Sequence, residues 1–288
     1  MSDAVRSVQH VLKAEDTLEG AGVRLKRAFG NGEVPLFDPF LLLDNFASCN
    51  PSDYEAGFPW HPHRGIETVT YMLEGQVEHG DSLGNVGRID SGDVQWMSSG
   101  SGILHQEMPK RKEGMFQGFQ LWVNLPAKLK MSDPSYLGLT AKDIPVVQQD
   151  GGTVKVVAGR FQNVEGPVRG LNVDPTYLDV ALLPGERFRL PVKKGYTAFA
   201  YTVDGATKFP GKEGSLAPKR AVLLDDGDLV EAEAGPEGGR FLLVSGRPLH
   251  EPVAWYGPIV MNTHQEIEAA ARELRRGTFI KAKEIAGA

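Results

Sequence analysis

Two histidines stand two positions apart in the segment FPWHPHRGIE, residues 58–67. The segment otherwise has the composition of a β-strand, and residues i and i+2 of a strand point to the same face. We therefore expect His61 and His63 to project their imidazoles in one direction. Two imidazoles held this close repel each other when both are protonated, which lowers their pKa values and favours the neutral form that binds metal ions.

A second pair with the same spacing, His105 and Glu107, lies in the segment SGSGILHQEMP. If this segment forms a strand that faces the first, three imidazoles and one carboxylate converge. Such donors, without a thiolate, suit iron, nickel, copper, manganese or zinc and suit calcium or magnesium poorly. Four protein ligands on an octahedral ion would leave two adjacent positions for water, oxygen or a chelating substrate, whereas a structural zinc site is closed by four tetrahedral ligands. Gly100 and Gly102 beside the pair favour an open, loop-lined cavity.

The other candidate residues have no second histidine near them in the sequence. His79, in VEHGD, is expected to be a solvated residue of a hairpin turn. Cys49 is the single cysteine, so the chain forms no intrachain disulfide, and a reducing compartment is the natural interpretation. We therefore place the chemistry at the two pairs.

The elements that would position these pairs are short strands. Strand-like runs such as IETVTYML, FQLWVNL and TVKVVAG are a few residues long, and turn-forming residues follow each of them. The chain contains 34 glycines and 19 prolines, which interrupt such runs. Many short strands spaced in this way predict a β-sandwich or barrel. The best helical signal comes at residues 263–276, where Thr263 and Glu266 form a capping box and Gly277 can end the helix.

An internal repeat indicates two copies of one β unit. RGIETVTYMLEG at residues 64–75 aligns with KGYTAFAYTVDG at residues 194–205. At the same offset, Pro191 stands where the first copy has its first histidine, and Lys193 where it has its second. The second copy therefore cannot bind a metal in the same way.

The turn formers between the copies place the domain boundaries. We expect a metal-binding N-terminal domain at residues 1–133 and a linker at residues 134–150. The second domain, without metal ligands, is expected at residues 151–288 and ends in the predicted helix.

Composition excludes some classes of protein. The 288 residues are 41% hydrophobic and 24% charged, and the net charge is −6, whereas a broad nucleic-acid surface needs a basic field. No run of 18 apolar residues and no apolar leader segment occurs, so we expect no membrane segment. We expect a cytoplasmic monomer, or a nuclear one if the source is eukaryotic.

The two segments resemble motifs of the cupin superfamily, and more closely those of the pirin family. HPHRGIETVTYMLEG looks like the first cupin motif, and GDVQWMSSGSGILHQE looks like the second motif in its pirin form. The similarity continues through PLFDPFLLLDNF, QLWVNLPAKLKM and GPIVMNTHQEI, so it covers essentially the whole chain. It implies an all-β bicupin of two antiparallel β-barrel (jelly-roll) domains with a short C-terminal helix, in which only the N-terminal domain holds metal.

The resemblance also implies a ligand set. In pirins the metal is usually iron, held by the two pairs, and the donors here would also accept nickel, manganese, copper or zinc. Glu67, which corresponds to a metal ligand of many cupins, is not a pirin ligand, and we expect it to orient the site or to pair with Arg64. The implied ligands are His61, His63, His105 and Glu107.

Pirin-like proteins include quercetinases, which insert dioxygen into the central ring of a flavonol and expel carbon monoxide. The resemblance therefore implies a metal-bound flavonolate attacked by dioxygen, with Glu107 as the base that takes the proton of the 3-hydroxyl group. A flavonol is a large aromatic plate, so its pocket should be flat and apolar. The predicted walls are the apolar residues that flank the ligands in the sequence: Phe46, Phe58, Trp60, Trp96 and Met97.

The resemblance leaves a non-enzymatic alternative. Some pirins are regulators whose surface changes with the oxidation state of the metal and engages a transcription factor or a metabolic enzyme. In HEPVAWYGPIVMN, Trp255 and Tyr256 could anchor such a protein partner or could equally pack against the closing helix. A wide, aromatic-lined mouth favours the enzyme, and a narrow, plugged one favours the regulator.

Overall fold

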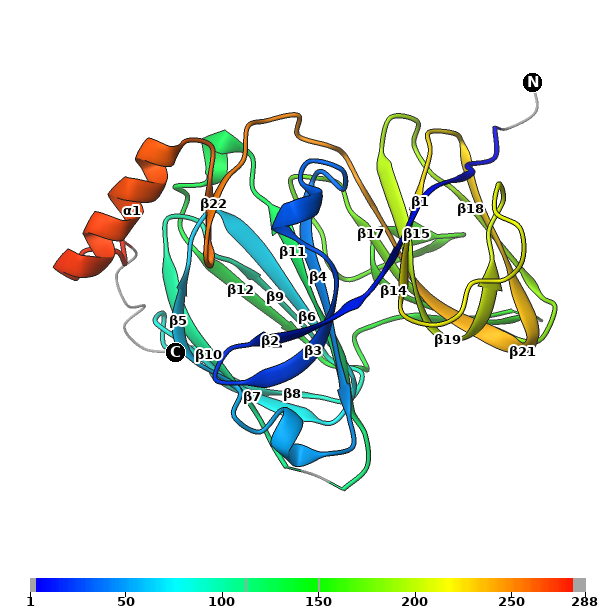
Figure 1. Ribbon diagram of the computed structural model, residues 1–288, viewed down its shortest axis with the longest axis horizontal. Helices are drawn as coiled ribbons and strands as arrows, with labels where there is room; N and C mark the ends of the chain where they lie inside the picture. Colours follow the sequence, from blue (N-terminus) through cyan, green and yellow to red (C-terminus); the bar gives the residue numbers. More distant parts are fainter. Residues whose placement is uncertain (1–3, 112, 150, 282–288) are drawn as a thin grey trace. The chain divides into compact units, whose positions relative to one another are not determined.

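The computed structural model describes residues 4–111, 113–149 and 151–281. Its regular structure is mostly antiparallel β-strand, with one α-helix near the C-terminus (Figure 1). By its contacts the chain divides into two compact units. Unit 1 comprises the described residues of 1–15, 36–39 and 142–249, and unit 2 those of 16–35, 40–141 and 250–288. The predicted all-β chain with two β domains and a closing helix is confirmed.

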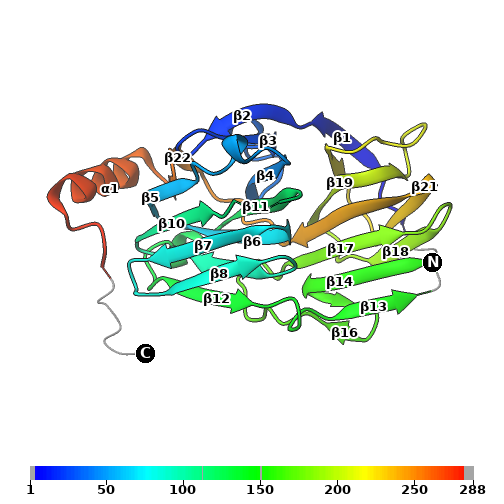
Figure 2. The same cartoon turned by 90° about the horizontal axis from the view of Figure 1, so that it is seen from below.

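Unit 2 contains two open sheets rather than one closed barrel. The larger has the strand order β12-β9-β6-β11-β4-β3-β2, and the smaller has the order β5-β10-β7-β8 (Figure 2). Both sheets contribute to the apolar core between them, for example through Met72 and Val77. The elements are β2 Glu15–Glu19, β3 Val23–Phe29, η1 Asn31–Glu33, β4 Phe40–Ser48, η2 Pro51–Asp53, β5 Phe58–His63, β6 Ile66–Glu74, β7 Gln76–Asp81, β8 Val86–Asp90, β9 Val94–Ser98, β10 Ile103–Pro109, β11 Phe116–Asn124, η3 Ala127–Leu129, β12 Ser135–Leu139, β22 Ala254–Tyr256, β23 Ile259–Met261 and α1 His264–Arg276.

Strand β10 lies between β5 and β7 and shows how the sequence sets the inner face of the smaller sheet. In ILHQEMP, buried positions alternate with half-buried ones, so His105 and Glu107 both point into the unit. On one side, β5 places His61 opposite His105. On the other side, β7 places Asp81 opposite His105 and His79 opposite Glu107. Polar side chains of three adjacent strands therefore share one face.

Helix α1 forms as the capping signals predict. The Glu266 backbone N–H donates to the Thr263 hydroxyl at 3.2 Å, and the Thr263 backbone N–H donates to the Glu266 carboxylate at 2.8 Å. Gly277 ends the helix with φ of 69°, in the left-handed region that glycine adopts without strain. The apolar face of α1 packs on the hairpin β22–β23.

The two units do not follow the predicted domain boundaries. The predicted linker, residues 134–150, contains β12, which pairs with β9 in unit 2, and β13, which pairs with β14 in unit 1. Strand β1 pairs with β20 of unit 1, about two hundred residues away, whereas β22, β23 and α1 belong to unit 2. Pairing between segments so far apart leaves no local pattern in the sequence, and a continuous division of the chain therefore misses it.

Unit 1 contains a main antiparallel sheet in the order β1-β20-β19-β21-β17-β14-β13, with β18 paired to β21, and a short β15–β16 pair. Strand β18 ends at Pro191, and the exposed Lys193 pairs with Asp174 at 2.5 Å. These are the positions where the repeat places the histidine pair of unit 2. The elements are β1 Val8–Lys13, β13 Val146–Gln149, β14 Gly152–Ala158, β15 Arg160–Phe161, β16 Val164–Glu165, β17 Thr176–Leu182, β18 Arg187–Pro191, β19 Thr197–Lys208, β20 Arg220–Leu224 and β21 Leu229–Gly246.

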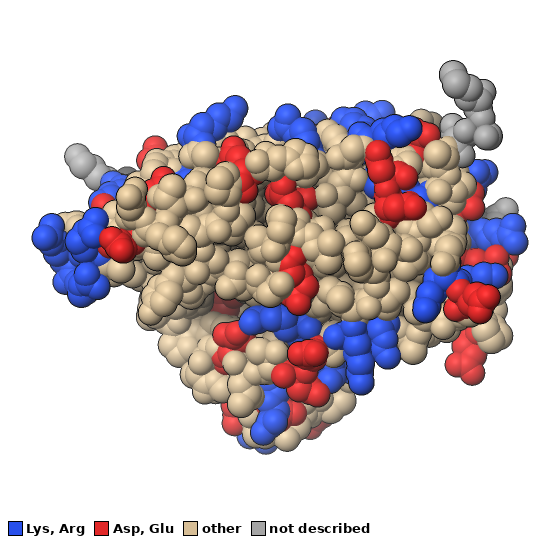
Figure 3. Space-filling view, turned by 45° about the horizontal axis from the view of Figure 1, so that its top comes forward, with Lys and Arg blue, Asp and Glu red and all other residues tan. Residues whose placement is uncertain are grey.

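The surface carries both signs of charge. On the face drawn in Figure 3, Lys and Arg side chains lie among Asp and Glu side chains, and uncharged residues make up much of the remaining area. The described part of the chain has no helix long and apolar enough to span a bilayer.

Candidate metal centre

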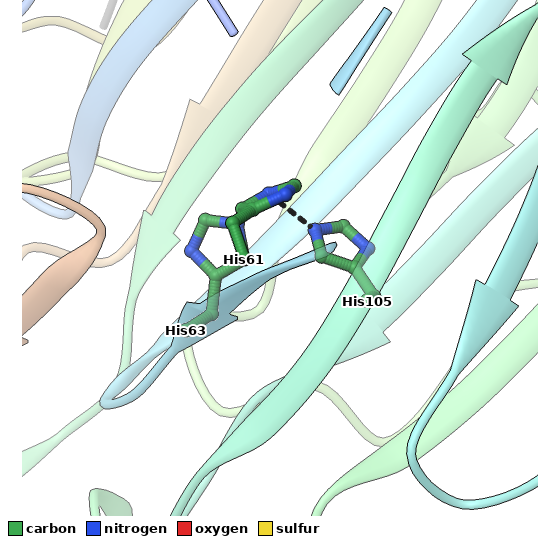
Figure 4. Close-up of side chains that lie close together, drawn as sticks. All are labelled: His61, His63 and His105. Carbon is green, nitrogen blue, oxygen red and sulfur yellow. Dashed lines mark hydrogen bonds between the residues drawn. The ribbon is translucent and has the colours of Figure 1, made fainter. Parts of the chain in front are cut away.

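Three histidines come together on the inner face of the smaller sheet of unit 2. Strands β5 and β10 run antiparallel with His105 opposite His61, and His63 follows His61 on the same face. The Nε2 atom of His61 lies 3.1 Å from Nε2 of His63 and 2.9 Å from Nε2 of His105 (Figure 4). One nitrogen from each ring lies within 4.8 Å of the other two. The structure thus brings together the three predicted nitrogen donors.

The opposite ring nitrogens show which atoms are free to bind a cation. Nδ1 of His61 lies 2.8 Å from the Pro59 carbonyl, and Nδ1 of His63 lies 3.1 Å from the Pro258 carbonyl. A carbonyl only accepts, so each Nδ1 carries the hydrogen, and each neutral ring has its lone pair on Nε2. The lone pairs of His61 and His63 face each other and cannot hydrogen-bond together, whereas a divalent cation between them would bind both and could also take Nε2 of His105. The donor set therefore fits a first-row transition metal.

Burial keeps two of these imidazoles neutral. His63 and His105 are each 1% exposed. Burial, with a smaller contribution from the nearby His61, lowers the pKa of His63 to about 3 in spite of the opposing hydrogen bond to the Pro258 carbonyl. Burial also lowers the pKa of His105 well below its usual value, with a further contribution from His63. Neutral imidazole is the form that ligates metal, as predicted from the spacing.

Glu107 lies outside this group of three. Its side chain points to the same inner face as that of His105 and is buried. One carboxylate oxygen accepts a 2.8 Å hydrogen bond from the Thr70 hydroxyl, and the other accepts a 2.6 Å hydrogen bond from Nε2 of Gln120. Both oxygens of Glu107 are therefore engaged within the unit, beside the nitrogen cluster rather than in it.

A cavity of about 720 Å³ opens beside His61 and His63. This volume lies within the range of small-molecule sites. The wall also contains an ion pair in which Arg27 donates to both oxygens of Asp44, at 2.9 and 2.7 Å. Burial raises the pKa of Asp44 to about 6, although Arg27 opposes the rise. The aromatic residues that line the cavity are Phe58, Trp60, Trp122, Trp255 and Tyr256.

The predicted walls are only partly those of this cavity. Phe58 and Trp60 line it, but Phe46 lies in the apolar core of unit 2. Trp96 and Met97 are buried on β9 of the larger sheet and do not line it. Adjacent residues of a strand point to opposite faces, so Trp96 and Met97 could not both face one cavity. Closeness to the ligands in the sequence does not predict which face a side chain takes.

Glu67 does not pair with Arg64. Its carboxylate accepts a 3.1 Å hydrogen bond from the Trp96 indole N–H. Burial raises the pKa of Glu67 to about 7, and the hydrogen bond from Trp96 opposes this only partly. Arg64, 2% exposed, donates instead to the Glu273 carboxylate at 2.7 Å and to the Phe279 carbonyl at 3.0 Å. Arg64 therefore ties the C-terminal segment to the chain beside the histidines.

His79 is not the solvated turn residue that the sequence predicts. It lies within β7, is 2% exposed, and its ring stacks on Tyr136 with centroids 5.0 Å apart. The glycine and aspartate after His79 are typical of a turn, but the strand continues through Asp81.

Several contributors to the site leave little or no signal in the sequence. Trp122 packs edge-on against His63, with ring centroids 5.1 Å apart, although β11 is buried at most positions and does not alternate clearly. The Pro258 carbonyl has no side-chain signal at all, because it acts through the backbone. Trp255 and Tyr256 were considered as anchors for a protein partner or as packing for the helix, whereas both line the cavity.

Comparisons with known proteins agree over nearly the whole chain. A family model described as Pirin matches residues 22–123, and one described as Pirin C-terminal cupin domain matches residues 177–280. A pirin-like protein of Caulobacter vibrioides is 46% identical over 277 residues, which cover 96% of this chain and 99% of that protein. A crystal structure of quercetin 2,3-dioxygenase from Acinetobacter baumannii has a TM-score of 0.88 and 33% identity, covering 96% of this chain and 99% of that one. A bacterial pirin from Escherichia coli in complex with nickel(II) shares the fold, with a TM-score of 0.65, 21% identity, and coverage of 83% of this chain and 98% of that one.

Proposed function

This chain belongs to the pirin family, and on that premise we propose that it is a metal-dependent flavonol 2,3-dioxygenase. The observation that carries the proposal is the set of three convergent imidazole nitrogens beside a cavity with aromatic walls. The similarity to a quercetin 2,3-dioxygenase structure at 33% identity supports the choice of substrate class.

The proposed metal ligands are the three histidines and Glu107. We include Glu107 because it follows His105 by two residues on the same face of β10, and because a carboxylate would partly neutralise a divalent cation. Iron is the metal that we propose first, and nickel, manganese, copper and zinc suit the same donors. When bound, such a metal would act as a Lewis acid toward the 3-hydroxyl group, and a redox-active one such as iron would also supply the redox chemistry that dioxygen requires.

The residues of the cavity would hold the substrate against this centre. Trp60 and Tyr256 are 55% and 71% exposed, so both rings are available to contact an aromatic plate. Trp122, beside His63, closes the inner wall and keeps water from that side. Glu107 is the proposed acceptor of the 3-hydroxyl proton, and the hydrogen bonds from Thr70 and Gln120 would orient its carboxylate.

The test is oxygen consumption by iron-loaded protein on addition of quercetin, with carbon monoxide measured in the headspace. His63→Ala removes a buried member of the cluster and should abolish both signals. His264→Ala is the matched control, because His264 is exposed on α1 and lies outside the cluster. Equal uptake by the wild type and His63→Ala, or no uptake with iron bound, would contradict the proposal and favour the regulator.

A further inference from the structure

The three histidines differ in what holds the second ring nitrogen. Nδ1 of His61 and Nδ1 of His63 each donate to a backbone carbonyl. Nδ1 of His105 is buried and has no hydrogen-bond partner among the described residues. Figure 4 shows this nitrogen directed away from the other two imidazoles. A histidine that ligates a metal almost always donates this N–H to an acceptor, so the surroundings of His105 should contain one.

Strand β7, which pairs with β10, offers two candidates, Asp81 and His79. Asp81 lies opposite His105 in the β7–β10 pairing, and paired residues of adjacent strands project to the same face. The ring of His79 lies 5.7 Å from that of His105. Nε2 of His79 is likewise buried without a hydrogen bond, 3.5 Å from the carboxylate of Asp81. One buried ring nitrogen of each histidine and the Asp81 carboxylate thus lie on the inner face that β7 and β10 share.

The hydrogen bonds around these groups set their protonation. Nε2 of Gln95 donates to Nδ1 of His79 at 2.8 Å, so the hydrogen of His79 is on Nε2, toward Asp81. The flipped amide would leave a lone pair on that Nε2 facing a carboxylate, which is repulsive. Asp81 itself accepts from the backbone N–H of Leu83 and from the side-chain amide of Asn85, at 2.9 and 2.8 Å. The backbone N–H of Asn85 also donates to Oδ1 of Asp81, at 3.1 Å, so two backbone donors hold Oδ1, and Oδ2 is the oxygen that can still accept from an imidazole or a water molecule.

We infer that Asp81 and His79 are positioning residues for His105. The Asp81 carboxylate, directly or through one buried water molecule, accepts the Nδ1–H of His105 and so fixes Nε2 as the ligand atom. His79, held by Gln95, keeps the carboxylate in place. His61 and His63 donate to neutral carbonyls, whereas His105 would donate to a charged group and become the most electron-rich of the three donors. This inference rests on the metal site of the proposed function but not on its flavonol substrate.

The first test reads the tautomer of His105 directly in metal-free protein. Long-range ¹H–¹⁵N correlation spectra distinguish an Nδ1–H from an Nε2–H imidazole. We expect His105 as the Nδ1–H form in the wild type and a gain of the Nε2–H form in Asp81→Asn, which retains an oxygen for the backbone N–H of Leu83. A predominant Nε2–H form in the wild type, or the same tautomer in both proteins, would overturn the inference.

The second test measures affinity for Co(II), whose visible spectrum also reports the ligand field. Asp81→Asn and His79→Leu should each lower the affinity for Co(II) by about 10- to 100-fold and shift the spectrum. His79→Gln keeps an N–H near the Nε2 position, so its affinity for Co(II) should stay within about threefold of that of the wild type. Tyr136→Leu is the packing control, because Tyr136 stacks on His79. If Tyr136→Leu lowers the affinity as much as His79→Leu, packing explains the effect and the inference fails. If the wild type does not turn over quercetin, the proposed function is refuted, but the effect of Asp81 and His79 on metal affinity is still valid.

Discussion

Glu67→Gln should make unit 2 more stable, and by an amount that grows with pH. Glu67 is 4% exposed, and burial raises its pKa to about 7 from an ordinary 4.5. Between these two values the folded protein holds a proton that the unfolded chain has lost, so stability falls as the pH rises through this window and is lowest above the folded pKa. A difference of 2.5 pKa units corresponds to about 3 kcal/mol, most of which develops between pH 5 and pH 8. Glutamine has no such titration and keeps an oxygen for the Trp96 indole N–H.

Urea unfolding of metal-free protein, followed by tryptophan fluorescence, measures this effect. The difference in unfolding free energy between Glu67→Gln and the wild type should rise by about 2–3 kcal/mol from pH 5 to pH 8. The other titrating groups are common to both proteins and cancel in that difference. A difference that is constant with pH, or that falls, would refute the argument from burial. Fluorescence reports unit 2 alone, since all four tryptophans lie in it: Trp60, Trp96, Trp122 and Trp255.

Three further predictions concern the cavity and the C-terminal segment. Trp60→Ala and Tyr256→Ala should each raise the KM for quercetin by about 5- to 30-fold, because each variant loses about 1–2 kcal/mol of apolar contact with the substrate, and kcat should change less. Unchanged steady-state kinetics would show that these rings do not bind the substrate. Arg64→Leu should lower the unfolding free energy by about 1–3 kcal/mol, because Glu273 loses its ion-pair partner but, at 28% exposure, stays partly hydrated. Equal stability of this variant and the wild type in urea would contradict the prediction. In the same variant, limited proteolysis should cleave before α1 faster than in the wild type, because Arg64 holds Glu273 and the Phe279 carbonyl; equal cleavage rates would show that apolar packing alone holds the segment.

The part of the site that the sequence predicts is the part that strand periodicity determines. His61 and His63 share a face because they stand two apart in a strand, and the same rule places His105 and Glu107 on one face of β10. The repeat predicts that unit 1 lacks the histidines, and the structure has the exposed Lys193 at the corresponding position. Each of these inferences needs only the local pattern of side chains.

The part that the sequence does not predict depends on contacts between distant segments. The hydrogen bond from His63 to the Pro258 carbonyl joins residues 195 positions apart and involves no side chain of the acceptor. Trp96 and Met97 lie close to the ligands in the sequence, yet β9 lies between β12 and β6, and neither side chain lines the cavity. His79 has the local composition of a turn, and only its partner strand β10 shows that it is a buried neighbour of His105.

An anomalous difference map from crystals of iron-loaded protein would test the central claim most directly. We predict one peak at coordination distance from Nε2 of His61, His63 and His105, with an oxygen of Glu107 turned from Gln120 toward it. A peak at the histidines with Glu107 still bonded to Thr70 and Gln120 would confine the metal site to three ligands. No peak between the three Nε2 atoms, with iron bound elsewhere or absent, would contradict the account.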